Sequence, residues 1–187
     1  MRKEFTEYEV EEMNVKLENG DTYIETGCIG TSEETFNTKT ISKKCKGIVT
    51  KQRTRHAGGG EVKITGHILY SAYCKMHGME NSDLKDGIMS YGSGIHPTMC
   101  VTLKVRDEDN ILKLKAYPNA VVSTGPSRKI DATSEEVAEV EMTLALSNDE
   151  FGQCEYEKII EDEKTEEAFI TSWMTSFSHD LVKKAAS

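Results

Sequence analysis

The chain has 187 residues, a formal net charge of −9, 37% hydrophobic residues and 29% charged residues. This length suits one domain with a single sizeable core, and no apolar run approaches the length of a membrane span. The start of the chain lacks the apolar core of a signal peptide, so we expect the protein to be made and used in a cytoplasm. The five cysteines are scattered without a CxxC pair, which favours reduced thiols over disulfides.

The first elements are an arm and a hairpin. Residues 1–12 are acidic and polar without a clear period, and we interpret them as an N-terminal arm. The stretch from Met13 to Leu17 alternates, Asn19-Gly20 is a two-residue turn signal, and the chain returns from Thr22 to Thr26. This pattern predicts a β-hairpin.

A basic segment follows, because no acidic residue occurs between residues 35 and 60. Its cations are Lys39, Lys43, Lys44, Lys46, Lys51, Arg53 and Arg55. β-branched residues flank Gly58-Gly59-Gly60, which predicts two strands, 47–55 and 61–69, around a flexible glycine tip. A basic segment with few apolar residues gains little from folding onto its own core. We therefore expect residues 35–69 to form a hairpin arm that reaches something acidic.

The middle of the chain predicts one helix and several strands. Residues 70–78 fit a two-turn helix ended by a glycine C-cap, and residues 81–97 a structured loop. Residues 101–106 and 112–117 alternate as a second hairpin, and residues 137–146 form the longest alternating run. We expect both strands of the second hairpin to be half-buried, with these cations on outward faces: Lys104, Arg106, Lys113 and Lys115.

The last part of the chain is strongly acidic. Between Glu135 and Glu167 there are thirteen acidic residues against two lysines. A chain with separate basic and acidic segments can pair them internally or between copies of itself. We interpret residues 161–187 as a C-terminal arm. A spacing of four residues relates Phe169, Trp173 and Phe177, which fits a helix or a strand and leaves that choice open.

No motif in the sequence indicates a catalytic, metal-binding or phosphate-binding site. Cys74-x-x-His77 is half of a zinc-binding spacing, and Cys100 or His96 would have to complete it, but the second closely spaced pair is missing. The three consecutive glycines lack the Lys-Ser/Thr of a phosphate loop, and no local motif supports a Cys–His nucleophile pair. We therefore expect no catalytic residue, no cofactor and no metal, and a protein that is not an enzyme.

Ordered short motifs carry a family resemblance. They are Asp86-Gly87-Ile88, Tyr91-Gly92, His96-Pro97, Lys115-Ala116-Tyr117-Pro118-Asn119-Ala120, Ser123-Thr124-Gly125-Pro126-Ser127-Arg128-Lys129-Ile130, Glu135-Glu136-Val137-Ala138-Glu139-Val140-Glu141 and Trp173-Met174. Residues 39–73 are similar as well. Together these stretches resemble the major tail protein, or tail tube protein, of long-tailed siphophages that infect Gram-positive bacteria.

The resemblance implies a mainly β fold over residues 1–187: a β-sandwich or open barrel with a short flanking helix and an extended hairpin arm. It implies a structural virion protein whose copies form rings of six, stacked into a hollow tube through which DNA passes without specific binding. Arms bridge neighbouring copies in that family. Implied partners are identical subunits, tape-measure protein and tail terminator, with no membrane. The implied locations are the virion tail and, during assembly, the host cytoplasm.

We expect subunit contacts between the basic arm and the acidic run. The expected interface residues are Lys43, Lys44, Lys46, Lys51, Arg53, Arg55, Glu155, Glu157, Glu161, Asp162 and Glu163. The alternative interpretation is a small β-sandwich binding module that uses the basic hairpin on an acidic ligand or nucleic acid. Only one aromatic residue, Phe36, lies between residues 35 and 60, and the chain as a whole is acidic, which disfavours nucleic acid.

Overall fold

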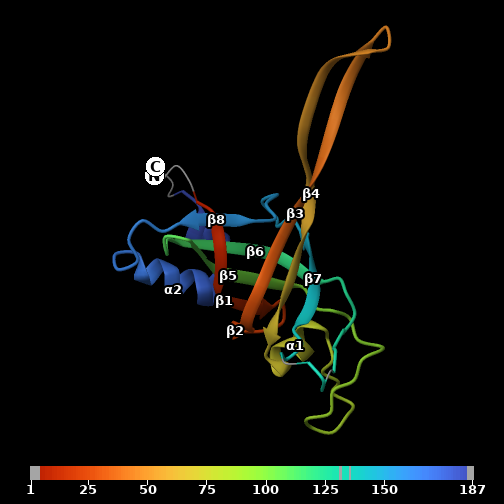
Figure 1. Cartoon of the computed structure of the whole chain (residues 1–187), viewed down its shortest axis with the longest axis vertical. Helices are drawn as coiled ribbons and strands as arrows, with labels where there is room; N and C mark the ends of the chain where they lie inside the picture. The colour runs from red at the N-terminus through yellow and green to blue at the C-terminus, as the bar shows by residue number, and fades with distance from the viewer. Residues whose placement is uncertain (1–4, 131, 135, 185–187) are drawn as a thin grey trace.

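The computed structural model describes residues 5–130, 132–134 and 136–184 (Figure 1). The fold is mainly β, with 49% strand and 12% helix, as the sequence predicted. The elements are β1 (Glu7–Leu17), β2 (Ile24–Glu25), β3 (Gly27–Cys45), β4 (Ile48–Ile68), α1 (Tyr70–Met76), β5 (Met99–Asp107), β6 (Leu112–Val122), β7 (Val140–Ser147), β8 (Tyr156–Ile159), α2 (Glu167–Ser176) and α3 (His179–Val182).

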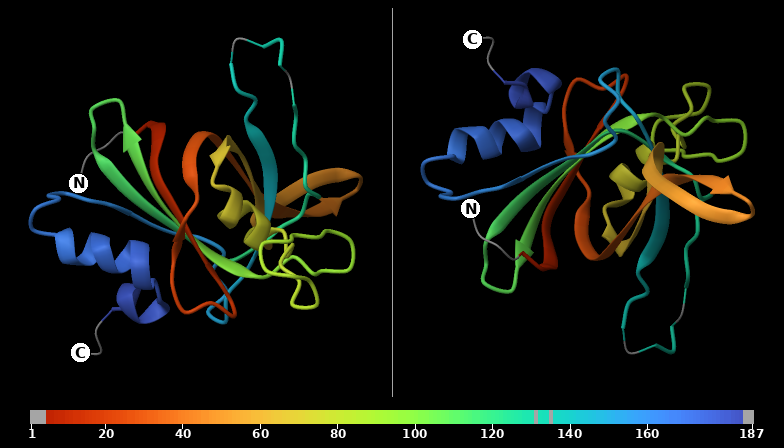
Figure 2. Two further views of the ribbon diagram at one scale, coloured as in Figure 1. Left: turned by 90° about the horizontal axis from the view of Figure 1, so that it is seen from below. Right: turned by 90° about the horizontal axis from the view of Figure 1, so that it is seen from above.

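All eight strands belong to one antiparallel sheet, in the order β2-β1-β5-β6-β7-β4-β3, with β8 paired to β6. The two ends of the sheet meet at Thr26, which joins β2 to β3. The Thr26 amide donates a 3.0 Å hydrogen bond to the carbonyl of Met13, and the Leu69 amide donates a 2.7 Å bond to the carbonyl of Thr26. The sheet therefore curls into an open barrel, seen from both ends in Figure 2.

Helix α1 supplies part of the core inside the barrel. Its side chains Tyr73, Cys74 and Met76 are buried in one cluster with strand residues such as Leu103 and Met142. The helix ends as predicted, because Gly78 adopts φ +59°, a conformation that glycine accepts without strain.

A second core lies on the outer face of the sheet, under α2. Ile170, Trp173 and Met174 follow a helical spacing and are buried against Leu112 and Leu114 of β6. The sequence left open whether Phe169, Trp173 and Phe177 lie in a helix or a strand. The structure forms a helix there, with Phe177 directly after its last residue. We expected residues 161–187 to form a C-terminal arm. For residues 161–184 this expectation was wrong, because α2 packs onto the sheet. Residues 185–187 lie outside the described residues.

Strand β6 serves both cores because its alternate residues face opposite sides of the sheet, and it also carries a bulge. Met99 pairs with Ala120 and Val101 with Tyr117, so β6 has one extra residue there. A bulge reverses the inward and outward alternation. Leu112 and Leu114 face α2, and Tyr117 faces the barrel interior by ordinary alternation. The bulge after Tyr117 then places Ala120 on the same interior side. The expectation that this hairpin is half-buried was wrong, because both of its faces are covered.

At the N-terminus the expected arm is part of the sheet. Residues 7–12 lie in β1, where Val10 pairs with Val105 of β5, whereas residues 1–4 lie outside the described residues. The predicted first hairpin is confirmed by the pairing of Val15 with Ile24.

The glycine-tipped turn predicted at residues 56–60 is wrong. The chain turns instead at Lys46-Gly47, both with positive φ, and β4 continues through the three glycines with a bulge. Gly59 has φ +69°, and a Cβ there would lie 2.5 Å from the carbonyl oxygen of Leu146. Gly59 is therefore required where β4 passes close to β7, and Gly60 where β4 passes close to β3, because a Cβ at Gly60 would lie 2.6 Å from the carbonyl oxygen of Thr35.

Candidate assembly surface

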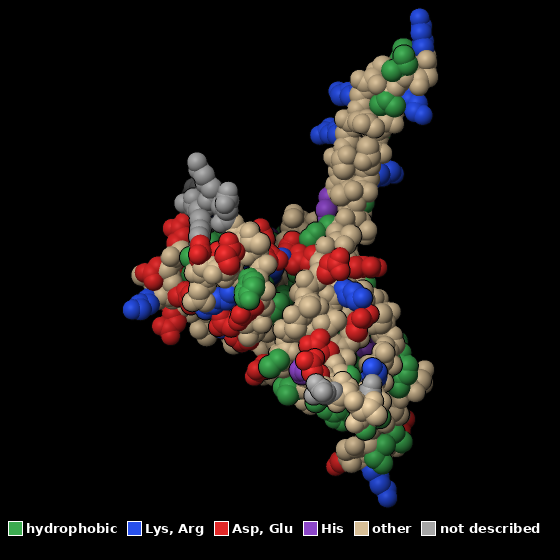
Figure 3. All heavy atoms as spheres, in the orientation of Figure 1, with side chains coloured by type: hydrophobic (Ala, Val, Ile, Leu, Met, Phe, Trp, Pro, Cys, Tyr) green, Lys and Arg blue, Asp and Glu red, His purple; other side chains and the backbone are tan. Residues whose placement is uncertain are grey.

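The distal part of the β3–β4 hairpin forms an arm that projects from the barrel (Figure 1). Every residue from 37 to 57 is exposed, so this part contributes nothing to either core. Near its tip, Ile41, Ile48 and Val49 are 50%, 70% and 44% exposed. Figure 3 shows Lys and Arg side chains along the arm, whereas acidic side chains gather on the body. The predicted hairpin arm is confirmed as an element of the fold.

The register gives the arm two different faces. Residues directly opposite each other in a sheet point to the same side, and neighbours along a strand point to opposite sides. One side, which we call the cationic face, carries the pairs Lys39 with Arg55, Ile41 with Arg53, and Lys43 with Lys51. The other side, the hydroxyl face, carries Thr38 with His56, Thr40 with Thr54, and Ser42 with Gln52.

The base of the arm is held by the segment between β7 and β8. The Gly59 amide donates a 3.1 Å hydrogen bond to Asn148 Oδ1. The Gly58 amide donates a 3.0 Å bond to His56 Nδ1, and His56 Nε2 lies 3.7 Å from the sulfur of Cys154. The arm therefore leaves the barrel at a bulge whose backbone is fixed by side chains from another part of the chain.

The predicted cations and acidic residues do not meet within one chain. None of the six predicted arm cations, nor Lys39, forms an ion pair with a described residue. Four of the five predicted acidic residues are exposed on the lobe of β8 and the segment before α2: Glu157, Glu161, Asp162 and Glu163. We call this set the acidic lobe. Figure 1 shows the arm standing apart from this lobe.

Glu155, the fifth predicted acidic residue, instead joins a largely buried polar cluster. Lys115, with a side chain 4% exposed, forms ion pairs with Glu34, Glu7 (3.0 Å) and Glu155 (3.3 Å). The Tyr117 hydroxyl donates a 2.6 Å hydrogen bond to Glu34. Burial alone would lower the pKa of Lys115, but the hydrogen bond and charge of Glu34 raise it above its ordinary value. Burial raises the pKa of Glu155 to about 7, against the opposing charge of Lys115.

The other strand cations are neutralised as well. Lys104 pairs with Glu12 at 2.5 Å, Arg106 pairs with Glu163, and Lys113 lies 3.2 Å from Glu157. These cations were expected on outward faces, where they would present positive charge. Their carboxylate partners cancel that charge.

Apolar side chains are exposed at the end of the barrel away from the arm. The loop between α1 and β5 carries Leu84, Ile88, Tyr91 and Ile95, with exposed fractions from 39% to 88%. Such side chains on one loop are typical of a surface that is covered in an assembly.

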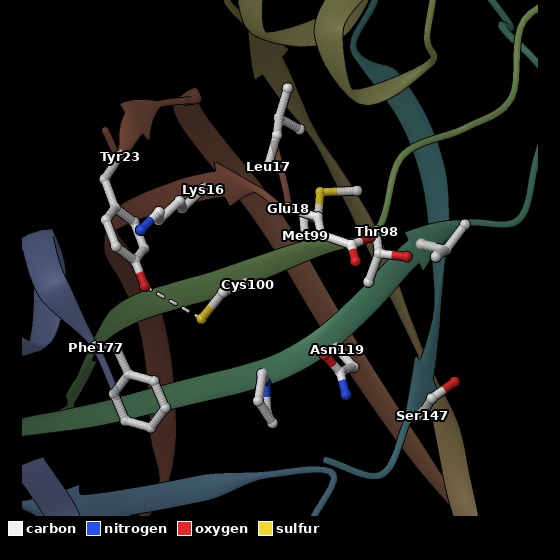
Figure 4. Close-up of a pocket in the computed structure, with 12 residues that line it drawn as sticks. Lys16, Leu17, Glu18, Tyr23, Thr98, Met99, Cys100, Asn119, Ser147 and Phe177 are labelled. Carbon is white, nitrogen blue, oxygen red and sulfur yellow. Dashed lines mark hydrogen bonds between the residues drawn. The ribbon is translucent and has the colours of Figure 1, made fainter. Parts of the chain in front are cut away.

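A pocket of about 540 Å³ lies on the outer face of the sheet, beside the β1–β2 hairpin (Figure 4). Tyr23 donates a 3.2 Å hydrogen bond to the sulfur of Cys100, and Phe177 closes one side. Burial raises the pKa of Cys100 to about 11, so this thiol is not activated as a nucleophile at neutral pH.

Metal-binding geometry is missing in the part of the chain that the structure describes, where no group of three or more His, Cys, Asp and Glu residues could hold an ion. Cys74 and His77 are both buried in the core, and burial lowers the pKa of His77. The described helices are also too short or too polar to cross a membrane.

No family model and no curated protein matches the sequence. Several solved structures are similar to the chain, among them the following two. One is the anti-feeding prophage cap, a tube-terminating cap, with 14% identity, a TM-score of 0.46, and coverage of 86% of this chain and 94% of that one. The other is the sheath/tube terminator of an extracellular contractile injection system in the extended state, with 14% identity, a TM-score of 0.44, and coverage of 84% and 99%. Both neighbours are tube-terminating proteins by their descriptions.

Sequence reasoning missed two features of this surface. It left Lys39 out of the interface set, although the alternation from Lys39 to Lys43 places both on one side of a strand. It also missed the cluster around Lys115. No local signal announces that cluster, because Glu7, Glu34 and Glu155 come from distant parts of the chain.

Proposed function

We propose that this protein is a structural subunit of a phage tail tube, which polymerises with identical copies as stacked rings, six to a ring, around a channel for DNA. The observation that carries the proposal is the arm, a two-stranded ribbon exposed from residue 37 to 57. An isolated two-stranded ribbon is at best marginally stable in water. An arm of this length is therefore best explained by a neighbouring molecule that covers it.

Open strand edges support the same proposal. Strand β3 pairs only with β4 along the arm, so its other edge presents unpaired backbone groups. Exposed edges are an aggregation hazard for a monomer, and closed assemblies remove them by pairing copies. The exposed apolar loop of residues 84–95 gives a further surface that an assembly would bury.

Electrostatics suits a conduit for DNA. The chain carries a net charge of −9, and the strand cations such as Lys104 and Arg106 are paired with carboxylates. A lumen without free positive charge lets a phosphate backbone slide without binding. The resemblance carried by the sequence motifs is the basis for proposing that the tail is that of a siphophage. It also gives the further partners, a tape-measure protein and a tail terminator, and the virion tail and host cytoplasm as locations.

Assembly would join the arm of one copy to acidic residues of another. The candidates for this contact are the predicted cations Lys43, Lys44, Lys46, Lys51, Arg53 and Arg55, and the predicted acidic residues Glu155, Glu157, Glu161, Asp162 and Glu163. Separate basic and acidic surfaces on one chain favour head-to-tail contacts, which close into rings or continue as filaments.

The test is a concentration series of the purified protein in negative-stain electron microscopy. Stacked rings or tubes are expected at high concentration. Single rings that never stack would identify a ring-forming end piece in place of a repeating subunit. A protein that stays monomeric at millimolar concentration would overturn the proposal.

The second candidate is a binding module for an acidic ligand or nucleic acid. The cationic face of the arm favours it, because five cations lie there without a described carboxylate partner. A salt-dependent gel shift of DNA by the monomer, without polymerisation, would select this candidate.

A further inference from the structure

The cationic face carries like charges directly opposite one another. Lys39 is paired with Arg55, and Lys43 with Lys51. Like charges in directly opposite positions of a sheet destabilise the pairing. No described carboxylate forms an ion pair with any of these four residues. The free arm therefore holds an electrostatic repulsion that an acidic partner would relieve.

The positive charge is also directional. Along a strand, side chains on one side repeat about every 7 Å, and cross-strand partners lie about 5 Å apart. The five cations Lys39, Lys43, Lys51, Arg53 and Arg55 thus form two short rows on one side of the ribbon. The hydroxyl face carries no Lys or Arg within residues 38–42 and 52–56, and the hydroxyls of Thr40 and Thr54 bond each other at 2.8 Å.

Two cations of the arm do not belong to these rows. Lys44 follows Lys43 in the strand and points to the other side, and Lys46 lies in the turn with φ +49°. Both were part of the predicted interface. They provide an internal control, because they have the same charge and exposure near the same tip.

We propose that the cationic face lies flat on the acidic lobe of a second copy of this chain, and that Lys44, Lys46 and Glu155 take no part in this contact. This inference rests on the proposed function and specifies its arm contact. It assigns the contact to one face of the arm, whereas the proposed function requires only that a basic segment attracts an acidic one.

Observations on both sides of the contact favour a protein partner. In the acidic lobe, Glu161 and Asp162 are exposed and form no ion pair with described residues, so their charge is available. Glu157 and Glu163 keep side chains that are 54% and 49% exposed despite their own partners. On the arm, Ile41 sits among the cations and is 50% exposed. An apolar side chain in the middle of the face suits a protein surface better than a row of phosphates.

The face is tested by two double variants of equal charge. Lys43→Gln/Lys51→Gln removes an opposed pair from the cationic face, and Lys44→Gln/Lys46→Gln removes two cations outside it. Self-association is measured by sedimentation velocity and electron microscopy, at low and at high salt. The first variant is expected to need about tenfold more protein to assemble at low salt, and the second less than about twofold more.

The partner is tested by charge exchange. Lys43→Glu/Lys51→Glu and Glu161→Lys/Asp162→Lys are each expected to assemble poorly alone and to recover when the two are mixed. Equal behaviour of the two glutamine variants, while the wild type assembles, would overturn this inference and leave the proposed function standing. Failure of the wild type to assemble would overturn both. Loss of DNA binding in the Lys43→Gln/Lys51→Gln variant, without loss of assembly, would overturn the protein partner and assign the face to nucleic acid.

Discussion

Tyr117 Oη donates a 2.6 Å hydrogen bond to Glu34 Oε1, and the same carboxylate oxygen accepts a hydrogen bond from the Lys115 ammonium group. Glu34 belongs to β3, whereas Tyr117 and Lys115 belong to β6, and the two strands are not neighbours in the sheet. This bridge ties opposite walls of the barrel together below the root of the arm. It is made of groups that are unfavourable to bury unless they are paired.

Replacement of the buried lysine should therefore be severe. Lys115→Met removes the cation among Glu7, Glu34 and Glu155, and leaves these carboxylates to repel one another. We expect a loss of about 3–5 kcal/mol in the free energy of unfolding, measured by urea denaturation. The exposed Lys63–Glu141 pair is the control, and Lys63→Met should cost less than about 1 kcal/mol. Similar losses in the two variants would contradict the role of the cluster.

Glu155 should make stability depend on pH. Its pKa is raised to about 7 in the folded protein, first by burial and then by the charge of Glu34, with Lys115 opposing. The folded state therefore holds a proton that the unfolded state releases, so this stabilisation is present below pH 4.5 and is lost as pH rises through 7. Between pH 5 and pH 8 the wild type should lose about 1–3 kcal/mol relative to Glu155→Gln. Parallel pH profiles of unfolding for the two proteins would refute this assignment.

Two of the glycines with positive φ in the hairpin, Gly47 and Gly59, should respond differently to alanine. Gly59→Ala places a Cβ 2.5 Å from the Leu146 carbonyl oxygen, in addition to the strain of φ +69°. Gly47→Ala meets nothing within 4 Å, so only its φ of +83° opposes the change. We expect a cost of about 1 kcal/mol at Gly47 and more than about 2 kcal/mol at Gly59 in thermal unfolding. The order would be reversed if the hairpin turned at the three glycines.

The C-terminal helix should be essential for stability. Trp173 is 1% exposed and donates a 3.0 Å hydrogen bond from Nε1 to the Lys115 carbonyl. Trp173→Ala should cost about 3–5 kcal/mol in the free energy of unfolding. Thr171→Ala, on the exposed side of α2, should change it by less than about 0.5 kcal/mol. A mild effect of Trp173→Ala would mean that the C-terminal segment is a detachable arm after all.

The sequence predicted the elements whose signals are local. The Asn19-Gly20 turn, the alternation in β5 and β6, and the glycine after α1 all depend on residues within a few positions of one another. The three glycines led to a wrong turn prediction, because glycine also occurs where two backbones approach closely. The approach of β4 to β7 depends on distant parts of the chain.

The candidate surface was predictable only in part. The basic composition of the arm is visible in the sequence, but the separation of Lys43 from Lys44 by face needs a register, and that register is set by the bulges of β3 and β4. The place of Glu155 in the polar cluster could not be predicted, because its partner Lys115 is far away in the chain.

The pairing of β1 with β5 has a consequence for the order of folding. The arm joins strands that follow one another directly, so it can form as soon as β4 has been synthesised. Strand β1, in contrast, has to wait for β5, which is more than eighty residues further along, before Val15 can pair with Val101. Contacts between distant residues form slowly because a long loop must be closed first. The nascent chain therefore extends its arm early and seals its barrel late.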